Sequence, residues 1–106
     1  MAKYYFTNKA VDDLSKIWNY TFDNWSEQQA DKYYQMLLDN CKGIAERPNI
    51  GKNYEGIVSQ LFGYRMGRHI IFYRKIHKGK VEITRILHEQ MDLKHRIVEI
   101  TKAGAI

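Results

Sequence analysis

Two side chains that could move protons or hold phosphate lie three residues apart in the second half of the chain. Arg85 and His88 occur in the segment Arg-Ile-Leu-His-Glu-Gln-Met-Asp, residues 85–92. Histidine titrates near neutral pH and serves as a general acid or base, and arginine binds phosphate through paired hydrogen bonds. With Arg65, these residues could supply the base, the acid and the cations that RNA cleavage through the 2′-hydroxyl requires. The same side chains could instead hold phosphate without chemistry, or fix a turn at the end of a strand.

The direction in which Arg85 points bears on these roles. In strict alternation along a strand it shares the apolar face with Val81, Ile83 and Leu87. A buried guanidinium must be paired, because an unpaired interior charge is costly. The acids that could pair with it are Asp92, Glu89 and Glu55. A bulge beside Arg85 would turn the side chain outward instead; we favour the structural ion pair.

The histidines and the cysteine show no metal-binding spacing. Neither an HxxxH nor a CxxC pattern occurs among His69, His77, His88, His95 and Cys41. Cys41 falls on an apolar helical stripe, which favours a small buried side chain over a nucleophile. The chain also lacks a phosphate-binding glycine loop, a nucleophile elbow and a dinucleotide-binding turn. We therefore expect no metal and no cofactor.

Positive charge is concentrated in the second half of the chain, whose total net charge is +5. Residues 1–46 hold five lysines against seven acids, and residues 47–106 hold twelve lysines and arginines against five acids. The cations of the predicted sheet, interleaved with tyrosine and phenylalanine, are Arg65, Arg68, Arg74, Lys75, Lys78, Lys80 and Arg85. Such a surface suits a polyanionic partner, either nucleic acid or an acidic protein. The alternative is a solvated outer face that resists aggregation.

The first of two predicted amphipathic helices follows Asn8, which could cap it. Apolar residues recur at three- and four-residue spacing from Val11 to Trp25. Asp13 falls with other charged residues on the opposite face. This pattern predicts a helix with one buried stripe.

The second predicted helix begins at Ser26, and Gln29 three residues later completes the capping-box pattern. Its apolar stripe runs from Ala30 to Ala45, and Pro48 ends it, because the residue before proline is pushed out of helical geometry. With almost no linker between them, the two helices should form an antiparallel hairpin over residues 8–47.

Strand patterns lie on both sides of this hairpin. Residues 1–7 are short, aromatic and β-prone, and residues 61–88 alternate with a period of two, with Gly79 in a plausible hairpin turn. The sequence therefore predicts a single α+β domain over residues 1–106, in which the helical hairpin packs on an antiparallel sheet of three to four strands. The tail, residues 93–106, fits a short helix or a strand.

Several classes of protein are excluded by the composition. A chain of 106 residues with 44% hydrophobic residues can build one core without disulfides or metal. No run approaches the length of a membrane span, and the N-terminal residues lack the pattern of a signal peptide. A lone cysteine forms no internal disulfide and suits a reducing compartment. We expect a cytoplasmic protein without a membrane partner.

Taken in order, these residues resemble the toxins of the RelE/ParE superfamily, and specifically the ParE branch. The most specific pieces are His-Ile-Ile-Phe-Tyr-Arg at 69–74 and Arg-Ile-Leu-His-x-x-Met-Asp at 85–92. The other matching residues are Ala10, Asp13, Leu14, Ile17, Trp18, Tyr20, Trp25, Gln29, Ala30, Tyr33, Tyr34, Leu37, Ile44, Pro48, Gly51, Gly63, Tyr64, Arg65 and Ile83. The resemblance covers about Lys3 to Asp92, so the tail lies beyond it.

The resemblance implies the toxin of a bacterial type II toxin–antitoxin pair that stabilises plasmids. Its partner would be a ParD-like ribbon-helix-helix antitoxin, which alone would contact operon DNA and whose acidic arm would fold onto the toxin. DNA gyrase would be the target, so the protein would poison an enzyme without being one. The residues expected to bind antitoxin or target are Arg65, Arg68, Arg74, Lys75, Arg85, Trp18 and Tyr34.

The resemblance also leaves a second activity open. In the RelE branch, cationic sheet residues and a C-terminal Tyr or His cleave mRNA on the ribosome. Here the last tyrosine is Tyr73, so no tyrosine follows Arg85. A ribonuclease would have to rely on Arg65, Arg85 and His88. A decayed toxin that only binds its antitoxin is a third possibility.

Overall fold

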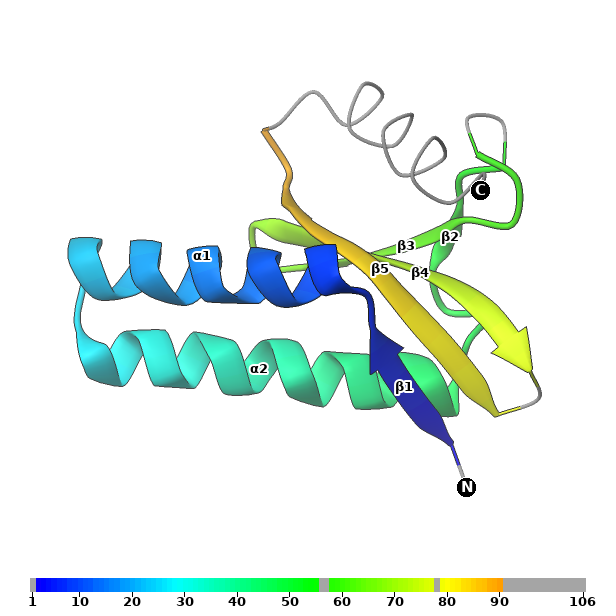
Figure 1. The fold of residues 1–106 in the computed structure, drawn as a ribbon, viewed down its shortest axis with the longest axis horizontal. Coiled ribbons are helices and arrows are strands. Elements are labelled where there is room, and N and C mark those ends of the chain that lie inside the picture. Colours follow the sequence, from blue (N-terminus) through cyan, green and yellow to red (C-terminus); the bar gives the residue numbers. More distant parts are fainter. Residues whose placement is uncertain (1, 56–57, 78, 91–106) are drawn as a thin grey trace.

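In the computed structural model, the described residues are 2–55, 58–77 and 79–90. Within these ranges the chain folds into two layers, a helical hairpin and a five-stranded sheet (Figure 1). The elements are β1 (Lys3–Phe6), α1 (Asn8–Asn24), α2 (Glu27–Glu46), β2 (Lys52–Asn53), β3 (Phe62–Met66), β4 (His69–His77) and β5 (Lys80–His88). Neither described helix is long and apolar enough to span a bilayer.

The predicted α+β fold and its helical hairpin are confirmed, but the sheet differs from the expected one. Its strand order is β1-β5-β4-β3-β2, five strands where three to four were expected. β1 runs parallel to β5, with Lys3 opposite Lys80, so the sheet is mixed. β2 has only two residues, too few to show alternation in the sequence. The predicted tail over 93–106 lies outside the described residues.

Each helix starts at a hydroxyl cap. Thr7, one residue before the predicted cap Asn8, accepts a hydrogen bond from the Ala10 amide at 3.1 Å. The Thr7 hydroxyl also donates to the carbonyl of Thr84 at 2.8 Å, which ties the start of α1 to β5. Ser26 caps α2 by accepting from the Gln29 amide at 3.1 Å. These contacts satisfy amides that the first turn leaves free.

Apolar side chains fill both faces of β4. Leu14, Leu37 and Ile71 belong to the cluster between the hairpin and the sheet, and Ile70 and Phe72 belong to a second cluster on the opposite face. The central strand is therefore enclosed on both sides, as its apolar run predicted. This double burial makes β4 and its neighbour β5 a firm base for side chains at their ends.

Cys41 lies in the cluster between the hairpin and the sheet and has no exposed surface. Burial raises the pKa of its thiol to about 12, because the interior disfavours the thiolate. The prediction of a small buried side chain is confirmed, and an unreactive thiol follows from its burial.

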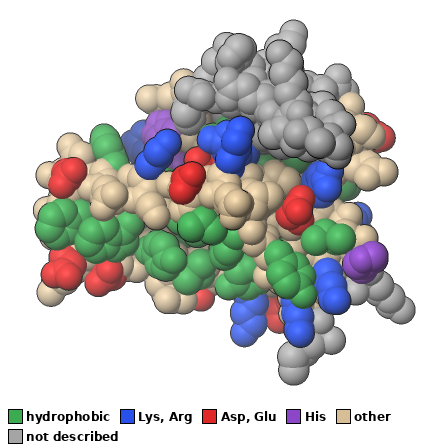
Figure 2. All heavy atoms as spheres, in the orientation of Figure 1, with side chains coloured by type: hydrophobic (Ala, Val, Ile, Leu, Met, Phe, Trp, Pro, Cys, Tyr) green, Lys and Arg blue, Asp and Glu red, His purple; other side chains and the backbone are tan. Residues whose placement is uncertain are grey.

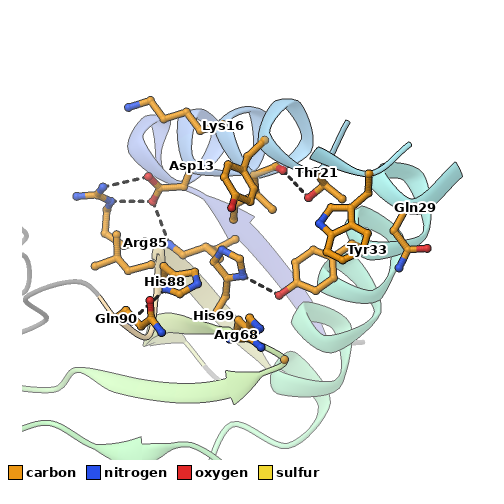
Figure 3. Close-up of a pocket in the computed structure, with 16 residues that line it drawn as sticks. Asp13, Lys16, Thr21, Gln29, Tyr33, Arg68, His69, Arg85, His88 and Gln90 are labelled. Atoms are coloured by element: carbon orange, nitrogen blue, oxygen red, sulfur yellow. Dashed lines mark hydrogen bonds and ion pairs between the residues drawn. The ribbon is translucent and has the colours of Figure 1, made fainter. Parts of the chain in front are cut away.

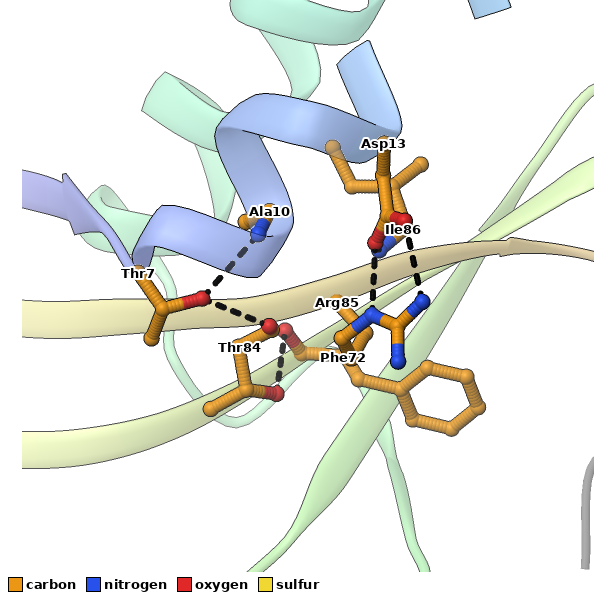
Figure 4. Close-up of polar contacts among 7 residues, drawn as sticks. All are labelled: Thr7, Ala10, Asp13, Phe72, Thr84, Arg85 and Ile86. Carbon is orange, nitrogen blue, oxygen red and sulfur yellow. Dashed lines mark hydrogen bonds and ion pairs between the residues drawn. The ribbon is translucent and has the colours of Figure 1, made fainter. Parts of the chain in front are cut away.

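A β-bulge at Thr84 changes the alternation along β5. Phe72 pairs with Arg85 and Tyr73 pairs with Ile83, so Thr84 is an extra residue on β5. Its hydroxyl donates to the carbonyl of Phe72 at 3.1 Å (Figure 4). After the bulge, Ile86 joins the core beneath the hairpin, whereas Arg85 shares the opposite face with Phe72.

Candidate functional site

An open groove of about 890 Å³ lies between α1 and the ends of the central strands. One wall is α1, and the other is formed by the start of β4, the end of β5 and the turn at Gly67 and Arg68 (Figure 3). Gln29 and Tyr33 of α2 close one end. The groove therefore gathers residues from both layers and from distant parts of the chain.

Asp13 on α1 forms the best-connected polar contact in this groove. Its carboxylate accepts hydrogen bonds from Arg85 Nε at 2.8 Å and Arg85 Nη2 at 3.0 Å, and a third from the Ile86 amide at 3.0 Å (Figure 4). The Asp13 and Arg85 side chains are only 8% and 12% exposed. A two-pronged charge-assisted contact of this kind fixes orientation as well as charge.

The Ile86 amide shows why the carboxylate is needed at this point. β1 pairs with β5 only as far as Ile83, where it lies opposite Phe6. Beyond that residue no strand among the described residues pairs with this edge of β5, and Asp13 supplies the acceptor that a strand would provide. Asp13 therefore docks α1 against this edge of β5.

Arg85 behaves as predicted in one respect and not in another. It is paired and largely buried, as we favoured, and the partner shown among the described residues is Asp13, which was not among the predicted acids. Glu89 pairs with Arg65, and Asp92 lies outside the described residues. The bulge at Thr84 also exists, and the side chain reaches around the sheet edge to α1 instead of pointing to solvent. Asp13, placed by its pattern on the polar helix face, is buried.

Two histidines lie side by side at the centre of the groove. His69 and His88 pair across β4 and β5, with ring centroids 5.3 Å apart. His69 Nδ1 shares a 2.6 Å hydrogen bond with the Tyr33 hydroxyl. Burial, and secondarily the charge of His88, lowers the pKa of His69 to about 4, so it is neutral at physiological pH. Burial also raises the pKa of Tyr33, which keeps its hydroxyl protonated.

The predicted cationic residues do not form one cluster. Arg68 and Arg85 line the groove. Arg65 is paired with Glu89, and Arg74 with Glu82 at 3.5 Å. Lys75 donates to Asn49 and lies 4.8 Å from the ring centroid of Phe62, at the other end of β4. The expectation of one shared basic surface is therefore met only at the groove.

Trp18 and Tyr34, the predicted aromatic contacts, lie outside the groove. Trp18 stacks on Phe22 at 5.2 Å and donates through Nε1 to Asp31 at 2.9 Å. Figure 2 shows hydrophobic side chains gathered in a band over the α1–α2 hairpin. We name the helix residues Val11, Trp18, Phe22 and Tyr34 the outer stripe, because helical spacing places them on one side of the hairpin.

Several groove residues were not predicted to be site residues. The sequence held a weak indication for two of them: Asp13 is an acid next to the core residue Leu14, and His69 begins a buried strand. Tyr33 was assigned only to the apolar stripe of the second predicted helix and to the family resemblance. Trp25 was assigned to the apolar pattern of α1 and Tyr20 only to the family resemblance, and both are exposed at the groove. No three metal-ligating side chains converge within the part of the chain that the structure describes.

The two-layer arrangement, with a helical hairpin on a mixed sheet, recurs in a known structure. A solved structure described as "Chromosomal ParDE TA system from P. aeruginosa" contains a chain with the same fold, at a TM-score of 0.70 and 21% identity. The match covers 83% of this chain and 96% of that one.

The sequence comparisons identify the family. The family model described as "ParE toxin of type II toxin-antitoxin system, parDE" matches residues 4–93. "Toxin ParE1" of Caulobacter vibrioides is 36% identical over 95 residues, and "Toxin ParE1" of Mycobacterium tuberculosis is 33% identical over 95 residues. Each match covers 87% of this chain and 94% of the relative. The chain belongs to the ParE toxin family of type II toxin–antitoxin systems.

Proposed function

We propose that this toxin acts in the cytoplasm as an inhibitor of DNA gyrase, without catalysing a reaction itself, and is neutralised by a ParD-like antitoxin. The gyrase target is what resemblance to the ParE branch implies. Operon DNA would be contacted only through the antitoxin. The antitoxin partner is supported by membership of a two-component family and by the likeness to a ParDE system.

The observation that carries this proposal is the internal pairing of the two arginines that RNA cleavage would need. Arg85 is bound by Asp13, and Arg65 is paired with Glu89. A site whose arginines are paired with acids of the protein itself supports a binding role over acid–base chemistry.

The antitoxin surface is best supported on the hairpin. The outer stripe presents aromatic rings, and aromatic side chains supply much of the binding free energy at interfaces. The predicted cations Arg65, Arg68, Arg74 and Lys75 lie on the sheet and its turn, where an acidic arm could reach them. Arg85 serves this role less well than predicted, because Asp13 already neutralises it.

A gyrase supercoiling and cleavage assay with the purified toxin, run beside a ribosome mRNA-cleavage assay, tests the function. We expect loss of supercoiling and accumulation of cleaved DNA, with ribosomal mRNA left intact. His88→Ala should leave gyrase inhibition unchanged, because His88 belongs to no expected gyrase contact. Far-UV circular dichroism of the variant would show that its fold is retained.

One observation favours the alternative hypothesis that the protein is a ribonuclease. His69 and His88 lie together in a groove that Arg68 also lines, so an imidazole and a cation face the same space. If the protein cleaves RNA, mRNA should be cut at codon-defined positions, His88→Ala should abolish the cuts, and gyrase should be unaffected. That result would contradict the gyrase proposal.

A further inference from the structure

Two aromatic rings at one end of the groove are open to solvent. Tyr20 is 67% exposed and Trp25 is 75% exposed, and both line the groove. Within the described residues neither ring stacks on another aromatic side chain, whereas Trp18 is covered by Phe22 at 5.2 Å. Large exposed aromatic faces beside a concave surface are typical of binding sites for planar ligands.

Two cations flank the same groove. Lys16 projects from α1 and Arg68 from the β3–β4 turn, on opposite walls (Figure 3). Asp13 is the one acid among the described residues that line the groove, and Arg85 and the Ile86 amide occupy its oxygens. Among the described residues, Lys16 and Arg68 form no ion pair. The groove therefore carries uncompensated positive charge that favours an anion.

His88 adds a directed donor. Its Nδ1 accepts a hydrogen bond from the Gln90 amide at 3.1 Å. In the neutral ring the proton must then lie on Nε2, which can donate to a ligand oxygen. At the aromatic end, the exposed Gln29 side chain offers an amide donor and an acceptor suited to the edge of a base.

We propose that this groove binds a nucleoside phosphate, either as a free nucleotide or as one unit of a single nucleic acid strand. The base stacks on Trp25 or Tyr20, and the phosphate lies between Lys16 and Arg68 within reach of His88. The groove volume falls in the range of about 300–1,000 Å³ that small-ligand sites occupy. An acidic protein segment would satisfy the cations but would leave the open rings without a planar partner. This inference goes beyond gyrase inhibition and requires no cleavage.

Binding is measured by fluorescence anisotropy with labelled single-stranded DNA and RNA, and with duplex DNA, over a range of salt concentrations. Adenosine 5′-monophosphate, detected by quenching of tryptophan fluorescence, represents the free nucleotide. Trp25→Ala should weaken single-strand binding roughly tenfold, because one stacking contact is lost. Arg68→Gln should weaken it and reduce the slope of log affinity against log salt by about 0.7, the value for one phosphate contact on a single strand.

Matched controls are Tyr5→Ala, an exposed aromatic on β1, and Arg47→Gln, an exposed arginine after α2. Both should bind as the unaltered protein does. Competition between the free nucleotide and the strand supports a single-unit site, and binding of the strand alone supports a site on a polymer. The proposal is overturned if neither binds at low salt, if the controls lose as much affinity, or if duplex binds more tightly than the single strand. It is equally overturned if only a glutamate-rich peptide binds with dependence on Trp25 and Arg68.

Discussion

His69 is held neutral by its surroundings, and this gives the fold a pH dependence. Its pKa is lowered from 6.5 to about 4 by burial and by the neighbouring His88. Below pH 6.5, His69 is protonated in the unfolded chain, whereas in the folded protein it is protonated only near pH 4. The contribution of His69 to stability is therefore complete above pH 6.5 and is lost as the pH falls toward 4.

We predict that His69→Gln flattens this dependence, because glutamine cannot titrate yet can still meet the Tyr33 hydroxyl. The measurement is the free energy of unfolding from urea titrations at several pH values between 7 and 4. His77→Gln, an exposed histidine at the end of β4, should keep the original slope. Equal slopes in the two variants would rule out His69 as the source.

At the level of single residues, the sequence predicted best those interactions that are set by residues close together in the chain. The pattern at Ser26 and Gln29 predicted the cap of α2, and the need to pair a buried Arg85 was predicted correctly. Its partner was missed because Asp13 is 72 positions away along the chain. Acids close to Arg85 in the sequence were considered, but Asp13 comes near Arg85 only because α1 docks against β5.

Among the elements, the docking of α1 depends most visibly on Asp13. We predict that Asp13→Ala lowers the free energy of unfolding by about 3–5 kcal/mol, because it removes the carboxylate that Arg85 and the Ile86 amide share. Adding Arg85→Met should restore part of the loss, since the buried charge that lost this carboxylate is then removed. Urea denaturation with a constant m-value is the measurement.

Asp12→Ala is the matched control, since Asp12 is exposed and adjacent on the same helix. It should change stability by no more than about 0.5 kcal/mol. A loss in Asp13→Ala no greater than in Asp12→Ala would mean that α1 is held by packing alone.

The elements themselves were largely predictable because their periodicity is a property of short segments. The two helices and the three strands β3, β4 and β5 follow from spacing. The parallel direction of β1, the two-residue β2 and the bulge at Thr84 do not, because each is fixed by a partner strand rather than by its own residues. The bulge at Thr84 sets the directions of the β5 residues that line the groove, so the composition of the groove could not be read from the sequence.

At the scale of the whole molecule, the outer stripe offers a surface distinct from the groove. We predict that Tyr34→Ala weakens binding of the proposed ParD-like antitoxin by roughly tenfold or more, as loss of an aromatic anchor does. Trp18→Ala should act in the same direction. Isothermal titration calorimetry with the purified antitoxin measures the change.

Tyr5→Ala again serves as the control, because this exposed aromatic lies on β1 outside the stripe. It should leave antitoxin affinity unaltered. If Tyr34→Ala and Trp18→Ala bind as tightly as the unaltered toxin, the antitoxin must use another face.

The parallel pairing of β1 with β5 has a consequence for how the toxin is made. β1 leaves the ribosome well before its neighbour in the sheet, because Thr7 and Thr84 are 77 residues apart along the chain. Long-range closure of this kind comes late and slowly. The groove also waits for β5, which delivers Arg85, Ile86 and His88. A nascent chain released before that strand emerges would therefore carry the helical hairpin without the finished sheet and without the β5 wall of the groove.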